Sequence, residues 1–152
     1  MKRIIILFFL FLVLTPTFVY ADNDVTPNAK NSVLIEVSTK KILFEKNKDD
    51  RVAVASLTKM MAQILILEEI EKGTLSWDEK VSASSNAAGY GGTQIYLQPG
   101  EVMTVKDLMK GISMASANDA TVVLAERIAG SEAEFVKMMN NKAKELALKN
   151  TN

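Results

Sequence analysis

The stretch VASLTKMMAQILILEEI, residues 54–70, decides how the rest of the chain is interpreted. Apolar residues fill most of its positions and Gly73 follows it, so it predicts a buried helix from about Ser56 to Lys72. Lys59 lies three positions after Ser56. Residues at positions i and i+3 share one helix face, so the hydroxyl and the amine are predicted to be neighbours.

The Ser56–Lys59 pair has a catalytic interpretation and a structural one. Unpaired N–H groups and the positive dipole end at a helix start would stabilise negative charge on the Ser56 oxygen, with the N–H of Ser56 as one oxyanion donor. Apolar neighbours would desolvate Lys59, lower its pKa and let it act as a base. Alternatively, the serine caps the helix and the lysine reaches out to water. The motif alone leaves both open.

The same spacing occurs at Ser38–Lys41, in a different context. Alternating apolar residues predict strands over 32–37 and 41–46, joined by a polar turn. A spacing of three has no special geometry across such a turn, so this pair is predicted to be solvated. Residues 22–30 are expected to form a loose lead-in to the hairpin.

The N-terminus predicts export. Lys2 and Arg3 precede an apolar run over residues 4–14, and a small-residue site ends at Ala21. The run is shorter than the about 20 residues that a membrane span needs. A signal peptide over residues 1–21, cleaved after Ala21, is therefore expected; an uncleaved N-terminal anchor is the alternative.

Composition narrows the chemistry of the remaining chain, residues 22–152, which is one domain in length. Without Lys2 and Arg3 it has 16 basic and 18 acidic side chains, so its charge gives no reason to expect a nucleic-acid partner. The sequence contains no Cys and no His. Disulfides, Ser-His-Asp triads and Cys-His pairs are therefore excluded, and zinc lacks its usual ligands. Nucleophilic chemistry must use Ser or Thr, with Lys or a carboxylate as base.

The second half of the chain predicts mostly helix. Ser-, Gly- and Asn-rich sequence up to about Glu101 predicts loops with one short helix near residues 84–88. Three helices are predicted after that. Thr104 with Asp107 starts the first, over 105–115, and the second runs from about Asn118 to Ile128. The third follows a capping box formed by Ser131 and Glu134. The last helix has one apolar face, formed by Phe135, Met138, Met139, Ala143 and Leu146.

A second polar motif, Ser116-Ala117-Asn118, lies between two of these predicted helices. A junction of this kind can direct a hydroxyl and an amide into a shared cleft. The alternative is that Ser116 or Asn118 simply caps the next helix.

Together, Ser-x-x-Lys at Ser56 and Ser-x-Asn at Ser116 resemble the motifs of the serine D-Ala-D-Ala carboxypeptidases, the low-molecular-mass penicillin-binding proteins. The resemblance extends from about Asn31 to the last residue; Val54 departs from it, where the family commonly has proline. It implies an α+β fold of the β-lactamase/transpeptidase type, with a mixed sheet, a helical region and the Ser56 helix at the centre. Only the N-terminal hairpin and the helices of that fold are expected in this chain.

The resemblance also implies roles for four residues. Ser56 would be the nucleophile that forms an acyl-enzyme, and Lys59 the general base. Ser116 would relay the proton to the leaving D-alanine, and Asn118 would hold Lys59 and the substrate amide. The implied substrate is a peptidoglycan stem peptide ending in D-Ala-D-Ala, at the extracytoplasmic face of the envelope. β-Lactams would acylate the same serine, and no cofactor or metal is implied.

The family's third element, a Lys-Thr-Gly strand, is absent from the sequence. We therefore expect residues 22–152 to be the N-terminal part of a catalytic domain, poorly folded and inactive alone, with membrane association only through a region further on. The hairpin is expected to expose an unpaired edge. Three other functions stay open: a β-lactamase, a non-catalytic peptidoglycan-binding protein, and a generic secreted helical domain. The β-lactamase is disfavoured because class A enzymes usually have Asp at the position of Ala117.

Overall fold

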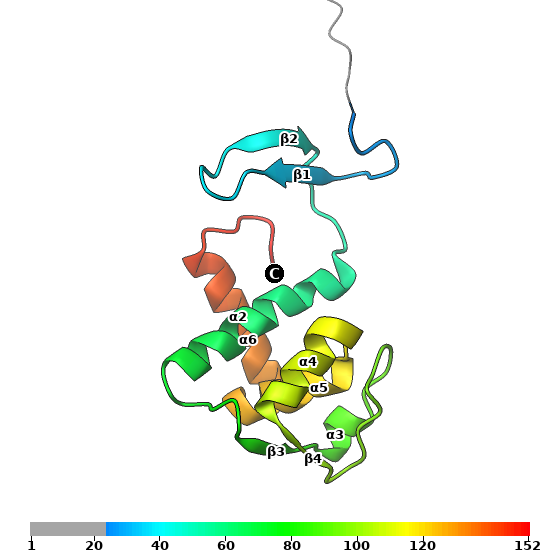
Figure 1. Cartoon of the computed structure of the whole chain (residues 1–152), viewed down its shortest axis with the longest axis vertical. Helices are drawn as coiled ribbons and strands as arrows, with labels where there is room; N and C mark the ends of the chain where they lie inside the picture. The colour runs from blue at the N-terminus through cyan, green and yellow to red at the C-terminus, as the bar shows by residue number, and fades with distance from the viewer. Residues whose placement is uncertain (1–23) are drawn as a thin grey trace, which may run out of the picture. The chain divides into compact units, whose positions relative to one another are not determined.

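The computed structural model describes residues 24–152, which divide into two compact units. Along the sequence, the first unit ends at Lys48 and the second begins at Asp49. The predicted signal peptide over residues 1–21 lies outside the described part. The first unit is a β-hairpin and the second is mainly helical (Figure 1). Within the described part, no helix combines the length and apolar character that crossing a membrane requires.

The predicted hairpin is present in the first unit. Strand β1 (Ser32–Ile35) pairs antiparallel with β2 (Ile42–Lys46). The turn is organised by Glu36, whose carboxylate accepts hydrogen bonds from the backbone N–H and hydroxyl groups of Thr39 and Ser38. These bonds, that of the Thr39 hydroxyl first, lower the pKa of Glu36 to about 2. The Ser38–Lys41 pair thus belongs to a turn, as predicted.

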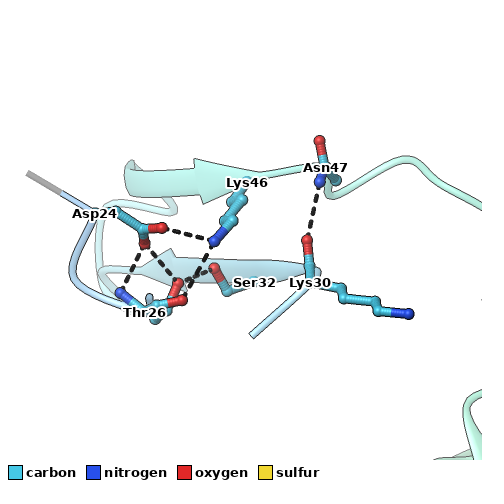
Figure 2. Close-up of polar contacts among 6 residues, drawn as sticks. All are labelled: Asp24, Thr26, Lys30, Ser32, Lys46 and Asn47. Carbon is cyan, nitrogen blue, oxygen red and sulfur yellow. Dashed lines mark hydrogen bonds and ion pairs between the residues drawn. The ribbon is translucent and has the colours of Figure 1, made fainter. Parts of the chain in front are cut away.

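The lead-in before the hairpin is not loose, contrary to the prediction (Figure 2). Asp24 Oδ2 forms an ion pair with Lys46 Nζ at 2.6 Å, and Asp24 Oδ1 accepts the Thr26 N–H at 2.8 Å. The hydroxyls of Thr26 and Ser32 lie 2.7 Å apart, and Asn47 Nδ2 donates to the carbonyl of Lys30 at 2.9 Å. Two of these contacts join residues that are 17 and 22 positions apart in the sequence, so local sequence patterns could not indicate them.

The helical unit packs around one central helix. Its elements are η1 (Ala55–Leu57), α2 (Thr58–Glu71), β3 (Lys80–Ser82), α3 (Ser85–Ala88), β4 (Val102–Thr104), α4 (Val105–Ala115), α5 (Asn118–Ala129) and α6 (Glu132–Glu145). Helix α5 contacts α2, α3, α4 and α6, and it lies among them in Figure 1. Most of its first eight residues are buried. The predicted helices are thus confirmed, including the Ser131 cap, which accepts the Glu134 N–H at 3.2 Å.

A small second sheet was missed by the sequence analysis, which expected only the N-terminal hairpin. Strands β3 and β4 pair antiparallel, Lys80 opposite Thr104 and Ser82 opposite Val102. Each strand has three residues, which is too short to establish an alternating pattern, and about twenty residues separate them. Val81, in the middle of β3, is buried in the helical core.

Helix α2 is buried on one face only, whereas the sequence predicted a helix buried in the core. Ala62, Leu65 and Ile66 lie in the core, but Met60 and Leu67 are 61% and 45% exposed. On α6, Leu146 is likewise exposed rather than part of the buried face.

Candidate active site

The serine of the first motif lies in the 3₁₀ turn that precedes α2. Ala55, the residue before Ser56, has a φ of 46°, in the left-handed region that costs a residue with a side chain about 1–2 kcal/mol. Such strain is retained where the surrounding structure requires it, often at functional sites. The Ala55 conformation sets the direction in which the chain enters the helix and thus the position of Ser56.

Lys59 lies at the centre of a cluster of polar side chains from both motifs. Its Nζ is 2.6 Å from Asn118 Oδ1, 3.3 Å from Ser116 Oγ and 3.5 Å from Ser56 Oγ. Desolvation lowers the pKa of Lys59 below its ordinary value of 10.5, and among residues 24–152 no carboxylate opposes this effect. Lys59 is half-buried, and its amine is directed to Asn118 and Ser116 rather than extended away from the protein.

Ser116 and Asn118 occupy the junction between α4 and α5. Ser116 ends α4 in the left-handed conformation, with a φ of 55°. The residue before α5 is Ala117, and no side chain caps this helix. The capping interpretation is therefore wrong for both residues, and their side chains are directed to Lys59 instead.

Asn118 also fixes a neighbouring segment, residues 91–97. Its Nδ2 donates to the carbonyl of Gly91 at 2.7 Å, and its backbone N–H donates to the carbonyl of Thr93 at 2.7 Å. The amide is thus held at both ends, by Gly91 on one side and by Lys59 on the other. This contact was not predicted: the family resemblance spans the segment, but its Ser-, Gly- and Asn-rich sequence indicated only loops.

Gly92 leaves room for the Asn118 amide. It has a φ of +83°, and a Cβ placed there would lie 2.7 Å from Asn118 Nδ2. We expect Gly92→Ala to lose about 1–2 kcal/mol of unfolding free energy through backbone strain, and also to displace the amide from Lys59. Urea unfolding and the NMR contact between the Asn118 and Lys59 side chains measure the two effects.

Gly100→Ala is the matched control for this prediction. Gly100 has the same φ of +83°, with nothing within 4 Å of the position of its Cβ. The control should lose similar stability while the contact between Lys59 and Asn118 persists. Equal loss of that contact in both variants would contradict a specific role for the space at Gly92.

All four residues predicted for the site are thus brought together, although nearly sixty positions separate the two motifs. Within residues 24–152 no cluster of three or more Asp, Glu, His or Cys side chains could hold a metal ion. The site offers a hydroxyl, a partly desolvated amine, a second hydroxyl and an amide. This set suits nucleophilic catalysis with lysine in the place that histidine takes in other serine enzymes.

The family is established by comparison with known proteins. The family model described as D-alanyl-D-alanine carboxypeptidase matches residues 18–152, so the chain belongs to this family.

Individual relatives agree with this assignment. The chain is 54% identical over 129 residues to D-alanyl-D-alanine carboxypeptidase DacF of Bacillus subtilis, covering 85% of this chain and 33% of DacF. It is 36% identical over 130 residues to DacA of Escherichia coli, covering 82% of this chain and 32% of DacA. The chain therefore spans about a third of the length of these relatives.

Solved structures confirm the predicted fold. The D-alanyl-D-alanine carboxypeptidase DacD of Francisella tularensis superposes with a TM-score of 0.82 at 36% identity, over 92% of this chain and 34% of DacD. Penicillin-binding protein D2 of Listeria monocytogenes, solved with ampicillin bound, gives 0.68 at 34% identity, over 78% of this chain and 46% of that protein. Residues 24–152 thus have the fold of the matching part of the penicillin-binding proteins.

Proposed function

We propose that the natural polypeptide carrying this chain is a serine-type D-Ala-D-Ala carboxypeptidase that acts on peptidoglycan stem peptides through an acyl-enzyme. The observation that carries the proposal is the position of Lys59 Nζ among Ser56, Ser116 and Asn118, with desolvation lowering the pKa of the amine. The family supports the substrate class, since its relatives are named for this activity.

An ammonium group at Lys59 donates to all three oxygens, those of Ser56, Ser116 and Asn118. The proposed reaction uses the neutral form, which can donate only two of these bonds. A neutral amine has two N–H donors and one lone pair, whereas an ammonium group has three donors and no acceptor. Asn118 Oδ1 can only accept, so it takes one N–H, and Ser116 Oγ takes the second. The lone pair is then directed to Ser56, whose hydroxyl proton it can remove.

The proposed reaction uses this arrangement in the following order. Lys59 Nζ takes the proton of Ser56, and the Ser56 oxygen attacks the carbonyl carbon of the penultimate D-alanine. The peptide C–N bond breaks, and the proton passes from Lys59 through Ser116 to the amine of the departing D-alanine. Water then hydrolyses the ester, which releases the shortened peptide and restores the Ser56 hydroxyl. Asn118 holds Lys59 and the substrate amide.

Covalent labelling of the natural-length polypeptide with a fluorescent penicillin tests this function. Peptide mapping should place the adduct on Ser56, and a D-Ala-D-Ala peptide should release D-alanine. An unlabelled protein that still binds peptidoglycan would contradict the proposal and favour a binding module. Rapid penicillin hydrolysis without D-alanine release would contradict it in favour of a β-lactamase.

We also propose that the protein is exported and works at the extracytoplasmic face of the envelope. The support is the sequence pattern of residues 1–21 and the location of the polymer on which the activity depends. Mass spectrometry of the protein recovered outside the cytoplasm is expected to give an N-terminus at Asp22. Recovery of a protein that still begins at Met1 would instead favour an uncleaved anchor.

A further inference from the structure

Asp119 is the one fully buried charged side chain among residues 24–152, with 0% of its surface exposed. Its Oδ1 accepts the backbone N–H groups of Ile95 at 3.2 Å and Ala120 at 2.8 Å, and its Oδ2 accepts that of Leu97 at 3.1 Å. Burying a carboxylate is costly unless hydrogen bonds replace its hydration. These three donors, together with the place of Asp119 in the first turn of α5, offset that cost.

Two of the three bonds join the start of α5 to residues 91–97, which lie more than 20 positions earlier. The same segment is bound by Asn118, through the carbonyls of Gly91 and Thr93. Neighbouring residues of α5 therefore hold the segment at four points along its length.

The far end of the segment is strained, and Asp119 is placed to hold it. Tyr96 has a φ of 62°, outside the region that residues with side chains prefer, and its side chain is 76% exposed. The N–H groups on either side of it, those of Ile95 and Leu97, are the ones bound to Asp119. An exposed tyrosine supplies little burial to offset this strain, so the conformation is maintained by the Asp119 bonds together with the packing of Leu97 and Ile95 on the core.

We infer that Asp119 is a positioning residue for the reaction. By fixing residues 91–97, it keeps the Gly91 carbonyl where it binds Asn118 Nδ2, so that Asn118 Oδ1 faces Lys59. Releasing the segment would free the amide to turn and would let water reach the amine. This inference rests on the proposed function, because it concerns the acylation of Ser56.

Asp119→Asn in the natural-length polypeptide tests the inference. The variant keeps the size of the side chain but replaces one acceptor oxygen by an N–H₂ donor, which repels a backbone N–H. We expect penicillin acylation of Ser56 to slow about 100-fold, as for other small misplacements of a catalytic group. The acid limb of the pH–rate profile should also move to higher pH, because a rehydrated Lys59 has a pKa closer to 10.5. If Asp119→Asn does not fold, Asp119→Ser, which keeps one acceptor, is measured instead. It is expected to slow acylation and to move the acid limb to higher pH in the same way.

Leu124→Ala is the matched control, because Leu124 is equally buried on α5 but makes none of these bonds. At a temperature where all variants are folded, the control should acylate at close to the wild-type rate with an unshifted profile. An equal loss in Leu124→Ala, or wild-type acylation in Asp119→Asn, would overturn the inference while leaving the function intact. Failure of the wild-type protein to label at Ser56 would instead overturn the proposed function.

Discussion

Lys59→Ala is expected to lower the rate of Ser56 acylation by about 10²–10⁴-fold, the contribution of a positioned general base. The reason is geometric, because Lys59 Nζ is the one basic group bonded to the Ser56 hydroxyl among the described residues. Stopped-flow measurement with a chromogenic β-lactam gives the rate, and intact mass gives the adduct. Lys59→Arg should lose as much, because a guanidinium stays protonated and cannot take the proton.

The matched control is Lys41→Ala, in the second Ser-x-x-Lys pair of the same chain. Ser38 of that pair bonds to Glu36 in the hairpin turn rather than to a lysine. The control should therefore acylate at the wild-type rate. A Lys59→Ala protein that acylates as fast as Lys41→Ala would contradict the role of Lys59.

The isolated chain, residues 22–152, is expected not to be labelled by penicillin. The family resemblance implies that the N–H of Ser56 is one oxyanion donor and that the second lies on the Lys-Thr-Gly strand, which the sequence lacks. Losing one such donor costs about 10²–10³ in rate. The hairpin also exposes apolar side chains, among them Leu34 and Leu43, which predicts aggregation. Gel-based labelling and size-exclusion chromatography measure the two effects.

A chimera provides the control for this expectation. In it, residues 24–152 replace the matching third of Bacillus subtilis DacF, to which the chain is 54% identical. The chimera should label at Ser56, which would show that the residues are competent when the remaining segments are present. Efficient labelling of the isolated chain would contradict the expected dependence on those segments.

The helices could be predicted because their signals are local. Thr104 and Ser131 accept the N–H of Asp107 and Glu134, the residues three positions later that the sequence paired with them. Gly73, with a φ of +77°, follows α2 at the predicted stop. Capping depends on residues within one turn, so the sequence is sufficient to place it.

The assembly of the site could be predicted only through the family resemblance. The spacing of Ser56 and Lys59 indicated that they were neighbours, but Ser116 and Asn118 reach Lys59 through tertiary packing of α5 against α2. The left-handed conformations of Ala55 and Ser116 gave no sequence signal, since neither residue is of a type that favours them. Such positions are set by the packed structure, not by local preference.

The dependence of Ser56 acylation on pH tests the central claim that Lys59 acts as a neutral base. Because desolvation lowers the pKa of Lys59 below 10.5, a larger fraction of the amine is neutral at any given pH below that value. The account predicts that the wild-type rate rises with pH through one ionisation below 10.5, and that Lys59→Ala lacks this rise. The same rise in both proteins would contradict it.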